Sequence, residues 1–238
     1  MLYSEENVRA NIRNRDGKRV FYLGKGDTLT PSARDWLQKQ RIPVLEGELA
    51  KPESYVLENG AFFREKPEHF THLRGNILVP KNHPVIAFRG AMDTLQAELL
   101  LAQAAAEGAV RQDLGEILDL TRKLLSWEVM QEPAVADNLC GLTESQQRHR
   151  SHFPQQYYGC PHFMPSWQDG AALLQINRAR CAARAAELAA AAAFIDPQGC
   201  CTRSDILQLL NRMSSMLYIL MIRLKREGNP WDRNPLTQ

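Results

Sequence analysis

Hydrophobic residues recur every three or four positions in four long stretches of the chain, the first of which begins at Pro84. In that stretch they are Val85, Phe88, Met92, Leu95, Leu99 and Ala102. This spacing places apolar side chains on one face of a helix. The four stretches cover residues 84–108, 114–125, 169–194 and 202–224. Four long helices joined by modest connections are typical of a helical bundle.

Residues 136–166 break this pattern, because they are polar and contain three prolines. We expect a short helix followed by a long irregular loop there. Thr202, followed three residues later by Asp205, resembles a capping box at the start of the last helix. The third stretch contains the alanine run 189–193, which would let neighbouring helices approach closely.

The first 65 residues have a different pattern. Residues 19–23 are a candidate strand that ends at glycine, and residues 42–45 are a second strand whose proline is typical of an edge. Thr30 and Pro31 predict the start of a helix that ends near Lys39. We therefore predict a mainly α fold, a bundle of about five helices with a small N-terminal α+β appendage. The predicted divisions are an appendage at residues 1–65, a connector at 66–83 and a helical domain at 84–238.

Composition narrows the function classes. The chain has 238 residues, 29 Lys plus Arg and 27 Asp plus Glu, so its net charge of +2 argues against a dedicated nucleic-acid-binding protein. Five cysteines, an odd number in a chain of this size, favour a reducing compartment. We see neither an export signal nor a stretch long enough to span a membrane, and therefore expect a cytoplasmic protein.

Polar side chains lie on helix faces that should be buried. On the third long helix they are spaced by three or four residues, and the last long helix carries a second polar stripe. The two stripes comprise Asn177, Arg180, Arg184 and Glu187, and Asn211, Ser215 and Tyr218. If both stripes and Asp93 face inward, they form a polyanion-binding site, because guanidinium groups match phosphate oxygens. The alternative is a structural ion pair between Asp93 and Arg180 or Arg184.

The connector contains hydroxyl, basic and glycine residues that could grip phosphate: Thr71, His72, Arg74 and Lys81. It carries no known phosphate-loop fingerprint, so an ordinary connection is the alternative. His149, His152, Cys160 and His162 are close in sequence, but their spacing is not a standard zinc signature. A structural metal at these four residues stays open.

Several of these segments resemble ATP:corrinoid adenosyltransferases. Four segments resemble motifs of the propanediol-utilisation type in the same order: residues 79–84, 88–95, 177–187 and 210–215. Two more resemble the ethanolamine-utilisation type, namely LTPSARDWL at residues 29–37 and KPEHFTHL at 66–73. The chain departs from the first type in lacking its T-G-D-x-G loop and in having Ser215 where an aspartate is usual. Residues 50–70 contain no cysteine, so the cysteine-rich metal motif of some ethanolamine-type members is also missing.

The resemblance implies a role for each matching residue. Asp93 and Arg180 would be a paired aspartate and arginine that shape a joint ATP and corrinoid site, with Arg184 as the third catalytic residue. The implied ATP contacts are Thr71, His72, Arg74, Lys81, Arg180, Arg184, Glu187 and Asn211. The implied corrinoid contacts are Phe163, Asp93, Asn211 and Tyr218, with Phe163 matching a phenylalanine below the cobalt.

The resemblance also implies a reaction and partners. Reduced cobalamin would take the 5′-deoxyadenosyl group of ATP and release triphosphate, with Mg²⁺ accompanying ATP and no metal held by the protein. The expected partners are further copies of the chain in a trimer or dimer, a flavin or flavoprotein reductant, and proteins of a bacterial microcompartment in ethanolamine utilisation. Two alternatives to an enzyme stay open: a non-catalytic helical scaffold of a metabolic assembly, and an ATP-sensing protein.

Overall fold

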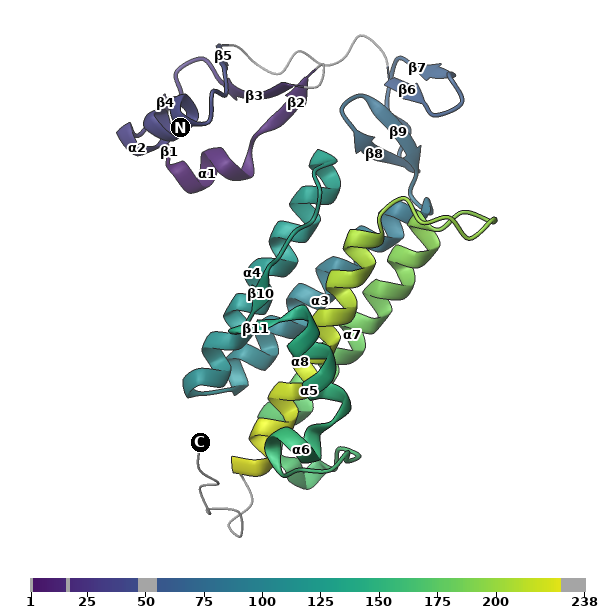
Figure 1. The fold of residues 1–238 in the computed structure, drawn as a ribbon. Coiled ribbons are helices and arrows are strands. Elements are labelled where there is room, and N and C mark those ends of the chain that lie inside the picture. Colours follow the sequence, from purple (N-terminus) through teal and green to yellow (C-terminus); the bar gives the residue numbers. More distant parts are fainter. Residues whose placement is uncertain (1, 16–17, 47–54, 228–238) are drawn as a thin grey trace. The chain divides into compact units, whose positions relative to one another are not determined.

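The computed structural model describes residues 2–15, 18–46 and 55–227. It divides the chain into two compact units, Met1–Lys81 and Asn82–Gln238. Helices form most of the second unit and short strands are confined mainly to the first, so the predicted mainly α fold with a small N-terminal α+β appendage is confirmed (Figure 1). None of the described helices has both the length and the apolar composition needed to cross a membrane.

The first part of the N-terminal unit packs two helices and short strands around a small core. Its elements are β1 (Leu2–Tyr3), α1 (Glu5–Ala10), β2 (Arg13–Arg15), β3 (Lys18–Leu23), β4 (Thr28–Leu29), α2 (Pro31–Lys39) and β5 (Val44–Glu46). In the three-stranded sheet, β3 pairs antiparallel with β2 and parallel with β5. The hydroxyl of Thr30 accepts a hydrogen bond from the backbone N–H of Ala33, which confirms the predicted helix start. The core comprises Val8, Phe21, Ala33, Leu37 and Ile42.

The predicted connector is part of a four-stranded sheet. Its strands are β6 (Tyr55–Leu57), β7 (Phe62–Phe63), β8 (Phe70–Arg74) and β9 (Ile77–Pro80), in the order β7-β6-β9-β8. β8 and β9 form a hairpin that turns at Gly75, whose φ of +51° a glycine adopts without strain. Leu73 of β8 and the consecutive residues Leu78 and Val79 of β9 are buried.

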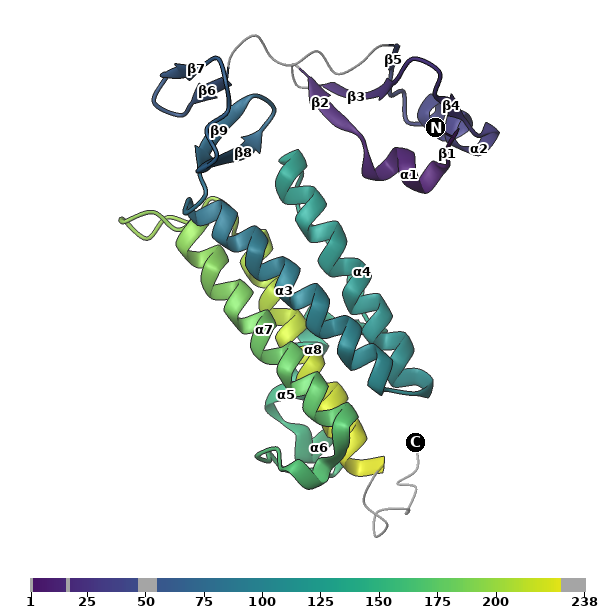
Figure 2. The ribbon, with the colours of Figure 1, turned by 180° about the vertical axis from the view of Figure 1, so that it is seen from behind.

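Four long helices form the second unit, as the hydrophobic pattern predicted: α3 (Pro84–Ala105), α4 (Gly108–Met130), α7 (Gly170–Phe194) and α8 (Ser204–Glu227). α3 lies between α4 and α7, and α7 lies between α3 and α8 (Figures 1 and 2). Six residues of α7 are buried: Leu173 and Ile176 in its first part, and then four alanines, Ala179, Ala183, Ala186 and Ala190. Small side chains let the helix backbones approach closely, as the alanine-rich sequence predicted.

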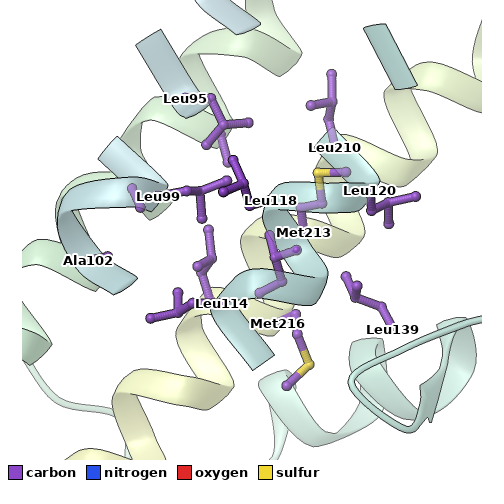
Figure 3. Close-up of a cluster of buried hydrophobic side chains, with 14 of the residues drawn as sticks. Leu95, Leu99, Ala102, Leu114, Leu118, Leu120, Leu139, Leu210, Met213 and Met216 are labelled. Carbon is purple, nitrogen blue, oxygen red and sulfur yellow. The ribbon is translucent and has the colours of Figure 1, made fainter. Parts of the chain in front are cut away.

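Larger apolar side chains fill the space between α3, α4 and α8. Leu95 and Leu99 of α3, Leu114 of α4 and Met213 of α8 are completely buried and point toward one another (Figure 3). At the edge of this cluster Leu139 closes the core from outside the long helices. The apolar faces that the helical period predicted therefore pack together into one continuous core.

Residues 136–166 are more ordered than the sequence indicated. They form the hairpin strands β10 (Asn138–Leu139) and β11 (Leu142–Thr143) and the helices α5 (Glu144–His152) and α6 (Pro154–Tyr158). A 3₁₀ turn, η1 (Trp167–Asp169), follows. Cys140 and Gly141 both have positive φ, +52° and +72°, as a two-residue hairpin turn requires. The prediction of one short helix and a long irregular loop was thus right only for part of this segment.

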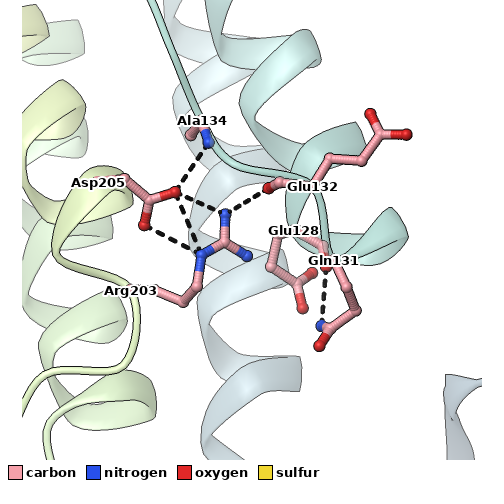
Figure 4. Close-up of polar contacts among 6 residues, drawn as sticks. All are labelled: Glu128, Gln131, Glu132, Ala134, Arg203 and Asp205. Atoms are coloured by element: carbon pink, nitrogen blue, oxygen red, sulfur yellow. Dashed lines mark hydrogen bonds and ion pairs between the residues drawn. The ribbon is translucent and has the colours of Figure 1, made fainter.

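The predicted capping box at the start of α8 was wrong. The hydroxyl of Thr202 donates to the carbonyl of Phe194, and α8 begins at Ser204. The carboxylate of Asp205 accepts hydrogen bonds from the Arg203 guanidinium and from the backbone N–H of Ala134, at 2.8 Å (Figure 4). Arg203 also donates to the carbonyl of Glu132. These bonds tie the segment after α4 to the start of α8, which a local capping motif would not do.

Candidate functional site

A cavity of about 800 Å³ lies in the helical unit, among α5, α7 and α8. Five of the residues predicted to contact the substrates line it: Arg180, Arg184, Glu187, Asn211 and Tyr218. They come from the polar stripes of two neighbouring helices, so the three- and four-residue spacing brings them to one place. Other lining residues include Arg148, His152, His162 and Arg212.

Arg180 is held in place by its own helix and by the next one. Its Nε and Nη2 both donate to the Asn177 side-chain oxygen, three residues earlier, at 3.3 Å. The guanidinium carbon lies 5.8 Å from the centre of the Tyr218 ring, an attractive cation–π geometry. Arg180 is therefore oriented by neutral groups and keeps its full positive charge for a ligand.

The neighbouring polar residues fall into two kinds. Asn211 donates from Nδ2 to the Glu187 carboxylate at 3.0 Å, which links α8 to α7 across the cavity wall. Arg184 is exposed and has no hydrogen-bond or ion-pair partner among the described residues. A free guanidinium on a cavity wall is a ready donor for an anionic ligand.

Two further arginines of this cavity were missed by the sequence analysis. Arg148 lies on α5 and Arg212 follows Asn211 on α8. Nε and Nη1 of Arg212 are buried without hydrogen-bond partners, and burial lowers the pKa of its guanidinium from the usual value. Arg212 could have been found from its position next to Asn211, whereas nothing in the pattern of α5 marks Arg148.

Tyr218 stands at the centre of an aromatic group. Its hydroxyl lies 2.8 Å from Nδ1 of His162, and the two rings stack with centres 5.8 Å apart. Burial raises the pKa of this hydroxyl. Phe163 stacks on the other side of the group, 6.2 Å from the Tyr218 ring, with the ammonium of Lys225 5.5 Å from its own ring. His162, and not Phe163, is among the residues that line the cavity.

Asp93 lies elsewhere. It is exposed on α3, and its carboxylate receives a 3.5 Å contact from Gln96 of the same helix. It does not line the cavity that contains Arg180 and Arg184. A single chain therefore does not bring the predicted acid and its two arginines together.

The predicted phosphate-gripping residues belong to the first unit. Thr71, His72 and Arg74 lie on β8, and Nδ1 of His72 is 3.0 Å from the carbonyl of Gly75. Lys81 follows β9 and forms an ion pair with Glu68 at 2.8 Å. The hydrogen bond and charge of Lys81 lower the pKa of the Glu68 carboxyl. Lys81 is half-exposed, so a stronger anion could exchange with Glu68.

The four residues considered as metal ligands have other contacts. His149 contacts the Tyr157 hydroxyl, and His162 contacts that of Tyr218. His152 contacts the carbonyl of Arg148, and the Cys160 thiol contacts the carbonyl of Pro161. Within residues 2–15, 18–46 and 55–227, no three His, Cys, Asp or Glu side chains are placed to share one metal ion. The chemistry of this cavity is that of four arginines facing one carboxylate, which suits a polyanion.

Comparison with known proteins gives a consistent result. The sequence model of a family described as cobalamin adenosyltransferase matches residues 61–224, more than half of the chain. The chain is 28% identical over 242 residues to the corrinoid adenosyltransferase EutT of Salmonella typhimurium strain LT2, covering 92% of this chain and 90% of that protein. It is 25% identical over 251 residues to the corrinoid adenosyltransferase EutT of Escherichia coli K12, with the same coverage.

Proposed function

Since this chain belongs to the cobalamin adenosyltransferase family, we propose that it transfers the 5′-deoxyadenosyl group of ATP to the cobalt of cob(I)alamin. Its similarity to two corrinoid adenosyltransferases over 92% of its length supports the same activity, in ethanolamine utilisation. The observation that carries the proposal is the cavity, in which Arg180 and Arg184 of α7 meet Asn211 and Tyr218 of α8.

The transfer is a displacement at carbon. Cob(I)alamin supplies an electron pair from cobalt to the 5′ carbon of ATP, and a cobalt–carbon bond forms. The bond between that carbon and the triphosphate oxygen breaks, and triphosphate leaves with the bonding electrons, so cobalt becomes formally Co(III). No general base is needed, because no proton moves. Negative charge grows on the departing oxygen, which fixed cations on the cavity wall stabilise.

The predicted site residues have different roles in this proposal. Arg180, fixed by Asn177 and Tyr218, and Arg184, which has no partner among the described residues, bind the leaving triphosphate. Glu187 and Asn211 hold each other and position the nucleotide. Tyr218 and Phe163 provide an apolar surface for the corrinoid. Thr71, His72, Arg74 and Lys81 supply further contacts to ATP, and Mg²⁺ enters with the nucleotide as its counter-ion.

Asp93 lies outside the cavity of its own chain, so in this proposal it acts across a contact between two copies of a homo-oligomer. A flavin or flavoprotein supplies the reducing electrons, and microcompartment proteins are further partners. The Asp93→Ala enzyme should lose activity, and its molar mass by light scattering should show an oligomer. A wild-type enzyme that is active as a monomer would contradict the proposal that Asp93 acts across a contact between two copies.

The test of the function is the absorbance change from cob(I)alamin to the light-sensitive alkylcobalt product, measured with ATP and chemically reduced cobalamin. Arg180→Ala should lower turnover by about 10²–10³-fold, the effect of removing one fixed charge donor from a transition state. Helix content by circular dichroism should not change.

Arg178→Ala is the matched control, since Arg178 is two residues away, is exposed, and pairs with Glu98 of α3 at 2.7 Å. It should keep wild-type turnover. If the wild-type protein forms no alkylcobalt product, it is a scaffold or an ATP sensor instead; if Arg180→Ala is fully active, the assignment of the triphosphate contacts is wrong.

A further inference from the structure

The structure contains a histidine on the cavity wall whose two ring nitrogens are both hydrogen-bonded within the protein. Nδ1 of His162 lies 2.8 Å from the hydroxyl of Tyr218, and Nε2 lies 3.1 Å from the backbone carbonyl of His152. We propose that His162 is a positioning residue for adenosyl transfer, which acts in its neutral form by holding Tyr218 against Arg180. The inference rests on the proposed function.

The tautomer of His162 follows from its partners. A backbone carbonyl can only accept a hydrogen bond, so Nε2 must carry the proton and donate it to His152. In a neutral imidazole Nδ1 then has a free electron pair and accepts the hydrogen of the Tyr218 hydroxyl. The Tyr218 hydroxyl is therefore held by the loop that carries His162.

The contacts of His162 lead through Tyr218 to Arg180, which is proposed to bind the departing triphosphate. The hydrogen bond to His162 fixes the position of the Tyr218 hydroxyl and so the direction of the side chain, and its ring is the aromatic surface under the Arg180 guanidinium. His162 is also stacked on Tyr218, with 9° between the ring planes. His162 therefore fixes the direction of Arg180 through Tyr218, while it need not touch ATP or the corrinoid itself.

Two substitutions at His162 distinguish the effect of its hydrogen-bond acceptor from the effect of its stacked ring. His162→Asn places an amide oxygen near the position of Nδ1, so it keeps an acceptor for Tyr218. His162→Phe keeps the stacked ring and removes the acceptor. We expect His162→Phe to lower turnover about tenfold, the effect of one lost hydrogen bond. His162→Asn should stay within about threefold of wild type, because the acceptor for Tyr218 is kept.

The chain offers a matched control outside the cavity. His149 of α5 makes the same kind of contact, from Nδ1 to the Tyr157 hydroxyl at 2.8 Å, but does not line the cavity. His149→Phe should keep wild-type turnover. The inference is overturned if His162→Phe turns over as fast as wild type, or if His162→Asn loses as much turnover as His162→Phe.

A second measurement does not depend on activity. In the ligand-free protein, nitrogen NMR of the imidazole side chains should show the neutral His162 with its proton on Nε2. Tyr218→Phe should shift the Nδ1 resonance, because that nitrogen loses its hydrogen-bond donor. A proton on Nδ1 would overturn the inference even in an active enzyme. Wild-type protein that has the expected tautomer and forms no alkylcobalt product would instead contradict the proposed function.

Discussion

The ion pair between Arg89 of α3 and Glu128 of α4 provides the sharpest test of what holds the bundle together. Nε of Arg89 donates to one oxygen of Glu128 at 2.8 Å and Nη2 donates to the other at 3.2 Å. The Glu128 side chain is 3% exposed and that of Arg89 is 19% exposed. Both charges were therefore largely removed from water during folding, and the ion pair with its two hydrogen bonds compensates for part of that cost.

Glu128→Ala leaves the Arg89 guanidinium largely buried without its carboxylate. Removal of one partner of a buried pair lowers the free energy of unfolding by 3–5 kcal/mol, and the residual exposure of Arg89 favours the lower end, about 3 kcal/mol. In a domain of this size each kcal/mol lowers the melting temperature by roughly 2–4 °C, so the expected loss is roughly 6–12 °C. The double variant Arg89→Met with Glu128→Leu should recover most of this loss, because it buries no charge.

Urea unfolding followed by circular dichroism at 222 nm measures these differences through the midpoint and slope. Asp119→Ala is the control on the same helix, because the pair Asp119–Arg122 is exposed and 3.7 Å apart. It should change the free energy of unfolding by less than about 0.5 kcal/mol. The reasoning is refuted if Glu128→Ala unfolds within about 1 kcal/mol of wild type, or if the double variant is no more stable than Glu128→Ala.

Two further predictions concern ionisable groups away from the cavity. Burial of Asp205 opposes its charge, but hydrogen bonds from Arg203 and from the Ala134 N–H outweigh burial and lower its pKa. A lowered folded-state pKa gives stability that is complete above the unfolded value of about 3.9 and is lost as pH falls through the folded value. Asp205→Asn should therefore be less stable than wild type at pH 7 and lose less on acidification below about pH 4, by calorimetry at each pH; parallel pH curves would contradict this. Burial, and then Asp113 and Glu116, raise the pKa of the Cys140 thiol, so iodoacetamide at pH 8 should label exposed Cys181 and Cys200 and spare Cys140, as read by peptide mass spectrometry. Labelling of native Cys140 at the rate of Cys181 would refute it.

The sequence predicted those parts of the fold that depend on one helix at a time. The four long helices follow from periodic burial. Arg180, Arg184 and Glu187 of the predicted stripe reached the cavity because residues three or four apart share a helix face. The start of α2 was also predictable, because Thr30 bonds to its own helix only three residues away. In each case either the hydrogen-bond partner is only a few residues away, or the prediction concerns only which residues share one face of a helix.

The failures share the opposite property. The carboxylate of Asp205 accepts a hydrogen bond from the Ala134 N–H, 71 positions earlier, and not from the start of its own helix. A local sequence motif cannot show so distant a partner. Arg148 reaches the cavity because α5 packs on α8, and the non-periodic sequence around it does not show which side will face inward. The sequence could not show that His162 lines the cavity and the adjacent Phe163 does not, because outside a helix or strand no period assigns side chains to a face.

The charge imbalance of the cavity is itself informative about function. Arg184 has no partner among the described residues, and Nε and Nη1 of Arg212 are buried without acceptors, although unpaired buried donors destabilise a folded chain. A sequence selected for stability alone would place carboxylates opposite these groups, as it does for Arg89, Arg203 and Arg223 elsewhere in the same unit. Local violations of this kind are expected at functional sites, where donors are oriented before the charge arrives. Because Arg180 is fixed by Asn177 and by Tyr218, which His162 contacts, and not by an acid, an incoming triphosphate meets its positive charge without first displacing a carboxylate.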